Sequence, residues 1–287
     1  MYTRRQFLQL AGIAVIGSQL PPLFNESLQE TPSMLGRALD AAAVYRRPSL
    51  DAAPVNRLWP DSIVPILDQR GAWYRTPDGY IAREMLQPMK PVPPFESVAL
   101  PSEAFWAEAA GPVAPVRRYC AADAPLVTRI GHGGIVRVID ALPDEPAPWY
   151  GVASDTGDLL GWTQAVHWRP AVESRPAGAA DIEIDVRAGR LTAWENGRAV
   201  LQAPFAAGQT LKPGSSVITG RLMGGARTGN FFGLPWRVVF GDYALAGVYW
   251  HNRFGAAVPG PALQVTPLLA EWLYHSLQEG RSRLIIL

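Results

Sequence analysis

The stretch DIEIDVRAGRLTAWENGRAVLQAPFAAG, residues 181–208, alternates apolar and polar side chains along much of its length. Alternation with a period of two is typical of β-strands that bury one face and expose the other. The Asn196-Gly197 pair divides the stretch, and this dipeptide favours the tight turn of a two-stranded hairpin. These residues therefore predict two antiparallel strands and a mainly β fold for the C-terminal third of the chain.

The composition of the whole chain agrees with this fold class. The chain has 287 residues, of which 48% are hydrophobic, so it holds enough apolar side chains to build real cores. It contains 27 Gly and 27 Pro, so it turns often, which argues against long helices. A chain of this length most often folds into about two or three domains.

Charge and cysteine content exclude several kinds of function. The formal net charge of +1 gives no electrostatic reason to expect binding to nucleic acid. The one cysteine, Cys120, rules out an internal disulfide framework and a zinc site built from several thiolates. No His stands with Asp or Glu at the spacing of metal ligands. We therefore expect no metal and no other cofactor.

Two stretches in the first two thirds of the chain share a layout. They are residues 44–88 and 116–170. In each, a short strand pattern is followed by a turn, an apolar strand pattern, a polar loop, a Trp-Tyr pair and a Gly-containing turn. Short strands bounded by Gly, Pro and Asp predict small barrels. The pairs Trp73-Tyr74 and Trp149-Tyr150 favour packing in such a barrel over a role as a ligand platform.

Both stretches resemble bacterial SH3-like domains, in part through GYI at residues 79–81 and LLGW at residues 159–162. The Pro-rich segment between them could begin a short helix at Ser102. The expected organisation is an SH3-like domain at 36–90, a linker at 91–112, a second SH3-like domain at 113–171, a linker at 172–180 and a last domain at 181–287.

Residues 1–27 predict an export signal. The chain opens MYTRRQFLQLAGIAVIGSQLPP, in which Arg4 and Arg5 precede a short apolar run. That run suits the apolar region of a signal peptide and is too short to span a bilayer comfortably. The arrangement resembles a twin-arginine signal, although a chance basic pair before a core helix is the alternative. We expect a secreted bacterial protein of the cell envelope or extracellular space, which touches a membrane only if the signal is retained.

The segment TPLLAEWLYHSLQEG, residues 266–280, predicts a short helix near the C-terminus. Thr266 is a favourable N-cap residue and Pro267 fits the first helical turn. The apolar residues recur at the helical period and form one face. That face consists of Leu268, Leu269, Trp272 and Leu273.

Residues 181–277 resemble the catalytic domain of L,D-transpeptidases, the YkuD family. The resemblance lies in VITG at 217–220, PWRVVF at 235–240, YWHNRFG at 249–255 and the Thr-Pro helix start. Members that carry SH3-like modules ahead of the catalytic domain show the same order. The resemblance implies two SH3-like barrels followed by an L,D-transpeptidase-like β-sandwich with a short C-terminal helix. It also implies a role in the peptidoglycan cell wall.

The resemblance fails at the residues that would carry the reaction. The family's first His is replaced by Ala246, and its Ser-His-Gly-Cys segment is replaced by Pro259, Gly260, Pro261 and Ala262. The nucleophilic thiolate and the His that activates it are therefore missing. Pro261 has no N–H to offer a developing oxyanion. We expect a pseudoenzyme without catalytic residues at these positions.

His251 is the imidazole left in this region, and a structural role for it outweighs a catalytic one. Aromatic side chains and an Arg that can pair with a carboxylate suit a peptide ligand. The expected partner is a peptidoglycan stem peptide or a cell-wall protein. Trp236 and Phe254 taken singly favour core packing. The candidate contacts are Trp236, Tyr249, Trp250, His251, Asn252, Arg253 and Phe254.

Two alternatives to a non-catalytic binding protein remain open. The frame around the lost residues is intact, so an active L,D-transpeptidase that cross-links peptidoglycan with a non-standard nucleophile is the first. In the second, the protein binds the wall through its SH3-like barrels, and the C-terminal domain is a structural remnant.

Overall fold

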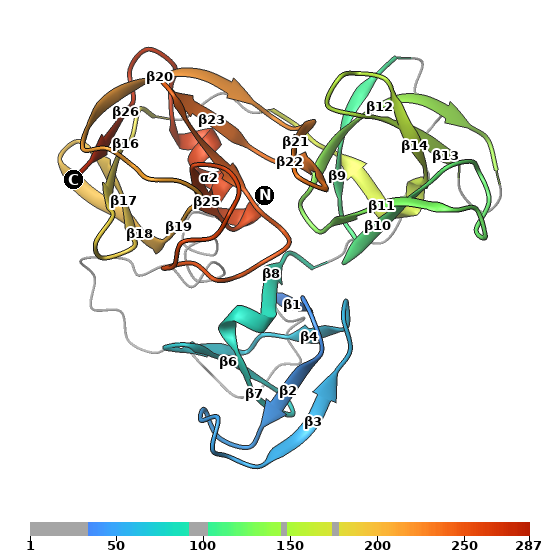
Figure 1. The fold of residues 1–287 in the computed structure, drawn as a ribbon, viewed down its shortest axis with the longest axis horizontal. Coiled ribbons are helices and arrows are strands. Elements are labelled where there is room, and N and C mark those ends of the chain that lie inside the picture. The colour runs from blue at the N-terminus through green and yellow to red at the C-terminus, as the bar shows by residue number, and fades with distance from the viewer. Residues whose placement is uncertain (1–33, 92–102, 145–147, 174–177) are drawn as a thin grey trace.

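The computed structural model describes residues 34–91, 103–144, 148–173 and 178–287. Within these ranges the protein is mainly β, with one α-helix, α2 (Pro267–Ser276). In the same ranges no helix has the length and apolar character needed to cross a membrane. The predicted export signal, with Arg4 and Arg5, lies outside the described residues. The chain forms three β-rich bodies, which we name domain 1 (34–91), domain 2 (103–173) and domain 3 (178–287) (Figure 1).

Domain 1 is built from eight short strands in two sheets, ordered β4-β1-β8 and β3-β2-β7-β6-β5. A single 3-10 turn, η1 (Arg83–Met85), precedes the last strand. The strands are β1 (Leu35–Ala38), β2 (Ala42–Tyr45), β3 (Pro54–Leu58), β4 (Ile63–Pro65), β5 (Asp68–Arg70), β6 (Trp73–Thr76), β7 (Gly79–Ala82) and β8 (Leu86–Met89).

Domain 2 forms one strongly curved sheet with the strand order β11-β10-β14-β13-β12-β9-β15. Here too a 3-10 turn, η2 (Ala165–His167), precedes the last strand. The strands are β9 (Phe105–Ala109), β10 (Val113–Arg117), β11 (Leu126–Gly131), β12 (Ile135–Leu142), β13 (Trp149–Ala153), β14 (Leu159–Gln164) and β15 (Trp168–Pro170).

Domains 1 and 2 share one pattern of strand pairing, so the repeat read from the sequence is a repeat of structure. The first strand pairs with the last strand in both domains, β1 with β8 and β9 with β15. The second strand pairs with the third in both, and β7 and β14 join the second strand from the other side. Tyr74, Trp149 and Tyr150 are buried, in agreement with packing roles for the Trp-Tyr pairs.

The helix expected from Ser102 is wrong, because Phe105–Ala109 is strand β9. The backbone of β9 pairs with β12 on one side and β15 on the other. Helix propensity in the Ala-Glu-Ala segment is a weak preference, and pairing on both edges outweighs it. The sheet of domain 2 therefore begins inside the segment expected to be a linker.

Domain 3 contains a nine-stranded sheet, ordered β18-β17-β16-β26-β20-β23-β24-β25-β19, which curves around α2 (Figure 1). A separate hairpin, β21–β22, extends toward domain 2. The strands are β16 (Asp181–Asp185), β17 (Arg190–Glu195), β18 (Arg198–Pro204), β19 (Ala206–Ala207), β20 (Gly214–Leu222), β21 (Ala226–Thr228), β22 (Phe231–Leu234), β23 (Arg237–Phe240), β24 (Tyr243–Gly247), β25 (Leu263–Val265) and β26 (Arg283–Ile286).

The turn and the helix cap predicted from short sequence motifs in domain 3 are confirmed. Asn196 and Gly197 both have positive φ, at 51° and 74°, as the expected hairpin turn between β17 and β18 requires. The hydroxyl of Thr266 accepts from the backbone N–H of Leu269 at 3.2 Å and caps α2. The helix is not the last element, because β26 follows it and lies between β16 and β20.

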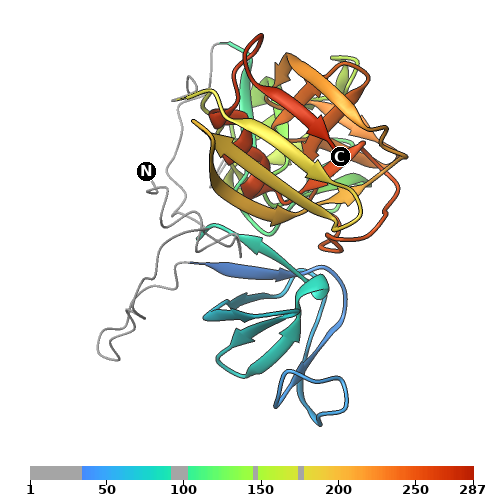
Figure 2. The ribbon, with the colours of Figure 1, turned by 90° about the vertical axis from the view of Figure 1, so that its left-hand side faces the viewer.

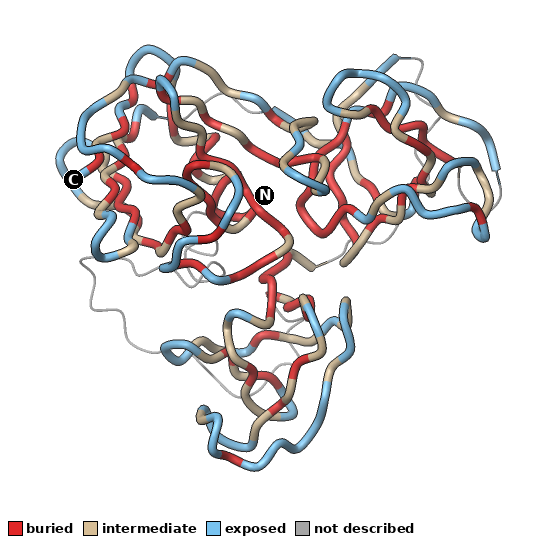
Figure 3. Tube along the Cα trace, in the orientation of Figure 1, coloured by how far each residue is buried: buried red, intermediate tan, exposed pale blue. Residues whose placement is uncertain are grey.

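Domains 2 and 3 share their hydrophobic cores. Ile135 of β12 is buried in the cluster formed by domain 3, and Tyr249 of domain 3 is buried in the cluster formed by domain 2. Figure 3 shows buried residues where these two domains meet. The core of domain 1 contains residues of domain 1 alone. Domain 1 lies below the other two in both views (Figures 1 and 2).

We expect the shared core to make domains 2 and 3 unfold together. Ile135→Ala, which leaves a cavity in that core, should lower the stability of this joint unit by about 2–5 kcal/mol. Ile81→Ala is the matched change, because Ile81 is buried in the core of domain 1. Calorimetry of the full chain should show Ile135→Ala shifting the transition of domains 2 and 3, and Ile81→Ala mainly the transition of domain 1. Separate transitions for domains 2 and 3 would contradict the shared core.

Candidate functional site

The positions at which the sequence resemblance would place catalytic residues, Ala246 and residues 259–262, lie on β24 and in the loop 248–262 that leads to β25. β24 and β25 are parallel neighbours, and Ala246 is in register with Gln264. Both residues are fully buried. Residues 243–265 contain no Ser, Thr or Cys, and both of their tyrosine hydroxyls have hydrogen-bond partners: that of Tyr249 donates to the carbonyl of Phe232, and that of Tyr243 accepts from the backbone N–H of Lys212. Thr266, the next residue, is occupied as the cap of α2.

The side-chain amide of Gln264 joins two parts of this loop through hydrogen bonds. Its Nε2 donates to the carbonyl of Val258 at 2.6 Å. Its Oε1 lies 2.8 Å from Nε2 of His251. Gln264 has no exposed surface, so these bonds satisfy polar atoms that would otherwise be buried without partners.

His251 has both ring nitrogens engaged. Its Nδ1 accepts from the backbone N–H of Arg253 at 3.2 Å, so the proton resides on Nε2 and is donated to Gln264. Burial lowers the pKa of His251, and the hydrogen bond to Gln264 opposes that change only in part. The imidazole is therefore neutral and has no lone pair directed at a substrate. This geometry agrees with a structural role.

The backbone of residues 206–208 packs closely against residues 258–262. The N–H of Gly208 donates to the carbonyl of Ala262 at 3.1 Å. A Cβ atom at Gly208 would collide with the carbonyl oxygens of Gly260 and Pro261, so only glycine permits this approach. The N–H of Val258 donates to the carbonyl of Ala207 at 2.9 Å, which is a second backbone hydrogen bond between the loop and residues 207–208.

A small apolar cluster fills the space under the loop. Phe254 packs there with Ala206, Val248 and Val258. The loop thus has a core of its own, which fixes its conformation. It is built as a packed element of the fold.

Five of the seven candidate contact residues are buried. Trp250 is half-buried and Arg253 is exposed. Tyr249 enters the core of domain 2, and its hydroxyl donates to the carbonyl of Phe232 at 2.7 Å. Trp250 stacks on Phe231, with ring centroids 4.2 Å apart and planes at 9°. The buried residues of the set are Trp236, Tyr249, His251, Asn252 and Phe254.

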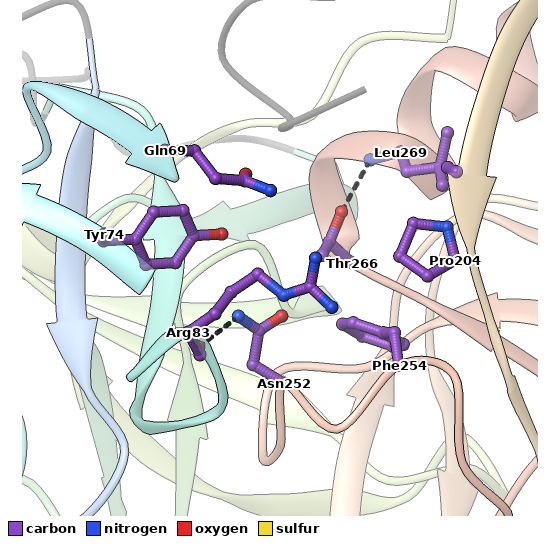
Figure 4. A pocket seen from close by; sticks show the side chains of 9 residues that line it. Gln69, Tyr74, Arg83, Pro204, Asn252, Phe254, Thr266 and Leu269 are labelled. Carbon is purple, nitrogen blue, oxygen red and sulfur yellow. Dashed lines mark hydrogen bonds between the residues drawn. The ribbon is translucent and has the colours of Figure 1, made fainter. Parts of the chain in front are cut away.

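Asn252 connects the loop to domain 1. Its Nδ2 donates to the carbonyl of Arg83 at 2.6 Å (Figure 4) and to that of Leu86 at 2.7 Å. Arg37 makes the reciprocal contact, because its guanidinium donates to the carbonyl of Tyr249 at 2.8 Å. The segment 249–252 is therefore a joint at which all three domains meet. Nothing in the sequence around Arg37 signals this contact.

Trp236 combines full burial with a strained backbone. Its φ of 54° is unusual for a residue with a Cβ atom. The ring packs against Tyr274 and His275 of α2, with centroids 5.1 Å apart in each case. Its indole N–H has no hydrogen-bond partner within the described ranges. This residue lies in the core of domain 3 and is closed to a ligand.

A pocket lies between domain 1 and domain 3, beside the joint. The side chain of Arg83 extends across it toward Phe254 (Figure 4). Its interior of about 20 Å³ has room for roughly one water molecule, which is too little for a peptide. Among the described residues, no group of three or more His, Cys, Asp or Glu side chains is arranged to hold a metal ion.

Solved structures to which this chain is similar include L,D-transpeptidases. The structure of the enzyme from Stackebrandtia nassauensis is 14% identical, with a TM-score of 0.34, and the match covers 40% of this chain and 58% of that one. An L,D-transpeptidase from Mycobacterium tuberculosis is 12% identical, with a TM-score of 0.35, over 61% of this chain and 92% of that one. The catalytic domain of the L,D-transpeptidase from E. faecium is 12% identical, with a TM-score of 0.32, over 38% of this chain and 96% of that one.

These likenesses are low in identity and partial in extent. This chain spans less than two thirds of the Stackebrandtia protein. No model of a protein family matches the sequence, and no curated protein matches it. The chemistry of the site therefore rests on its own geometry.

We expect Gln264→Ala to destabilise domain 3 by roughly 2–4 kcal/mol, because it leaves His251 and Val258 without their buried partners. Gln202→Ala is the control, since Gln202 is half-buried and makes one long bond of 3.3 Å to Thr192. Urea denaturation should show that the control lowers the free energy of unfolding by less than about 1 kcal/mol. Equal effects of the two changes would contradict the role given to Gln264.

Proposed function

We propose that this protein is an exported, non-catalytic relative of L,D-transpeptidases that binds peptidoglycan stem peptides or a wall-synthesis partner. The observation that carries the proposal is the closed arrangement around Gln264. It fills the place where the sequence resemblance puts the catalytic His and Cys. Export rests on the twin-arginine-type pattern at Arg4 and Arg5.

Acyl transfer by the family's route has no support in this loop. Ala262 carries no nucleophile, and the neutral His251 spends both ring nitrogens on protein partners. Pro261 cannot donate to an oxyanion, and losing one such donor alone costs about 10²–10³ in rate. The carbonyl of Ala262 is already bonded to Gly208.

A binding role is supported by the charge of this part of the chain. Residues 196–270 contain six basic side chains and a single acidic one, Asp242. Arg253 is exposed, and its guanidinium has no ion pair within the described part. A peptide with free carboxylates is a suitable ligand, because guanidinium groups bind carboxylates through paired hydrogen bonds. The basic residues are Arg198, Lys212, Arg221, Arg227, Arg237 and Arg253.

One observation favours wall binding through the SH3-like domains as a second candidate. Trp59, which follows β3 of domain 1, is 68% exposed. The guanidinium of Arg57 lies 5.5 Å from the centre of its ring. An exposed aromatic residue beside a cation is a common feature of ligand-binding surfaces.

Exposure to a carbapenem tests the absence of acyl transfer. We expect the intact mass of the purified protein to stay unchanged, because the loop offers no nucleophile. An active L,D-transpeptidase treated in parallel should gain the mass of the drug. A covalent adduct on this protein would overturn the non-catalytic assignment and favour the alternative nucleophile.

Binding to purified peptidoglycan tests the ligand. We expect Arg253→Ala to weaken binding about 10- to 100-fold, which corresponds to the loss of a charge-assisted contact. Arg187→Ala, which removes an exposed charge of the same domain outside residues 196–270, should leave binding within about twofold. Loss of binding in Trp59→Ala with none in Arg253→Ala would move the site to domain 1. The absence of binding by the unaltered protein would refute the peptidoglycan part of the proposal.

A further inference from the structure

Domain 1 is attached to the rest of the protein by polar contacts, in contrast to the apolar union of domains 2 and 3. Arg37 donates to the carbonyl of Pro112 at 2.7 Å and to that of Tyr249 at 2.8 Å. Asn252 donates to two carbonyls of domain 1. No hydrophobic cluster of the described residues includes side chains of both domain 1 and another domain. Interfaces of this polar kind are typical of domains that can move apart.

His132 lies at the centre of these contacts. It is buried in the turn between β11 and β12, and its Nε2 accepts from the backbone N–H of Lys90 at 3.2 Å. Its Nδ1 lies 3.0 Å from the carbonyl of Ala110 and therefore carries the proton. Gln87 of domain 1 donates to the backbone carbonyl of His132 at 2.9 Å. The neutral imidazole thus has every polar atom satisfied.

Charged groups from four elements surround His132. Glu108 of β9 and Arg169 of β15 form an ion pair at 2.8 Å. The ammonium group of Lys90, at the end of β8, pairs with the carboxylate of Glu271 on α2. Glu108, Arg169 and Lys90 all interact electrostatically with His132. The charges of Glu108 and Glu271 balance those of Arg169 and Lys90, so the group is neutral when His132 is uncharged.

We propose that domain 1 is a detachable module held by a polar latch centred on His132, and that protonation of His132 releases it. A proton on Nε2 of His132 would occupy the lone pair that accepts from the backbone N–H of Lys90. The two N–H groups would then point at each other across the domain boundary. The latch would then lose a contact and gain a buried charge. Release would uncover the joint at Tyr249 and Asn252, which domain 1 covers in the closed form.

The sign of the pH effect follows from the burial of His132, which lowers its pKa from 6.5 to about 4. A group whose pKa is depressed in the closed form favours that form above its ordinary pKa and ceases to do so as the pH falls. If release restores the ordinary pKa, the closed form loses up to about 300-fold in the docking equilibrium between pH 6.5 and 4. Burial raises the pKa of Glu271, which acts in the opposite direction.

Small-angle X-ray scattering of the full chain tests this proposal. We expect the radius of gyration to increase as the pH falls from 7.5 to 4, with a midpoint between 4 and 6.5, while near-ultraviolet circular dichroism keeps its folded signal. His132→Gln should stay closed throughout, because the Gln carbonyl oxygen can accept from Lys90 and does not titrate. His167→Gln is the matched control. It removes a half-buried His of domain 2 whose ring makes no hydrogen bond to domain 1 among the described residues, and it should keep the transition.

Three results would overturn the proposal. They are an unchanged radius down to pH 4 in the folded protein, the same transition in His132→Gln, and expansion that coincides with loss of the folded signal. If His132→Gln does not fold, Glu271→Gln provides the second test. It removes the partner of Lys90 and the opposing titration, so the midpoint should move to higher pH; an unmoved or lowered midpoint would contradict the latch.

Discussion

The buried amide of Gln264 is the constraint on which the loop of domain 3 depends. It accepts from His251 and donates to Val258, and so joins the two halves of a loop that has little regular structure. A buried polar group left without its partner costs about 1–3 kcal/mol, so this one side chain selects a single loop conformation. In that conformation the carbonyl of Ala262 accepts from the backbone N–H of Gly208 at 3.1 Å.

The segment 249–252 of this loop contacts the other domains. Tyr249 enters the core of domain 2, Trp250 stacks on the β21–β22 hairpin, and Asn252 holds domain 1. In this protein these side chains contact the neighbouring domains, so they are not available to bind a ligand in a cleft. The two unions differ in kind, since domains 2 and 3 share apolar cores and domain 1 is held by hydrogen bonds and ion pairs. Any ligand must therefore bind to residues that remain outside the joint, such as Arg253 and Trp59.

The sequence predicts features whose cause is local and misses those whose cause is distant. The Asn196-Gly197 turn and the Thr266 cap follow from a few adjacent residues, and both are confirmed. β9 and β26 were missed because each is a short segment held in the middle of a sheet by strands far along the chain. At the site, the absence of Ser, Thr and Cys can be read from residues 243–265 alone. The burial of Tyr249 and Asn252 could not be read in this way, since it depends on domains 2 and 1 lying against them.

The central claim is that the loop is closed around the bond between His251 and Gln264. Nitrogen NMR of the imidazole tests this directly, because it reports the tautomer and the protonation state of one ring. The account predicts a neutral His251 with a slowly exchanging proton on Nε2, and with a pKa below the ordinary value because the ring is buried. An imidazole that exchanges its proton rapidly and titrates near the ordinary value of about 6.5 would show an open loop and contradict the account.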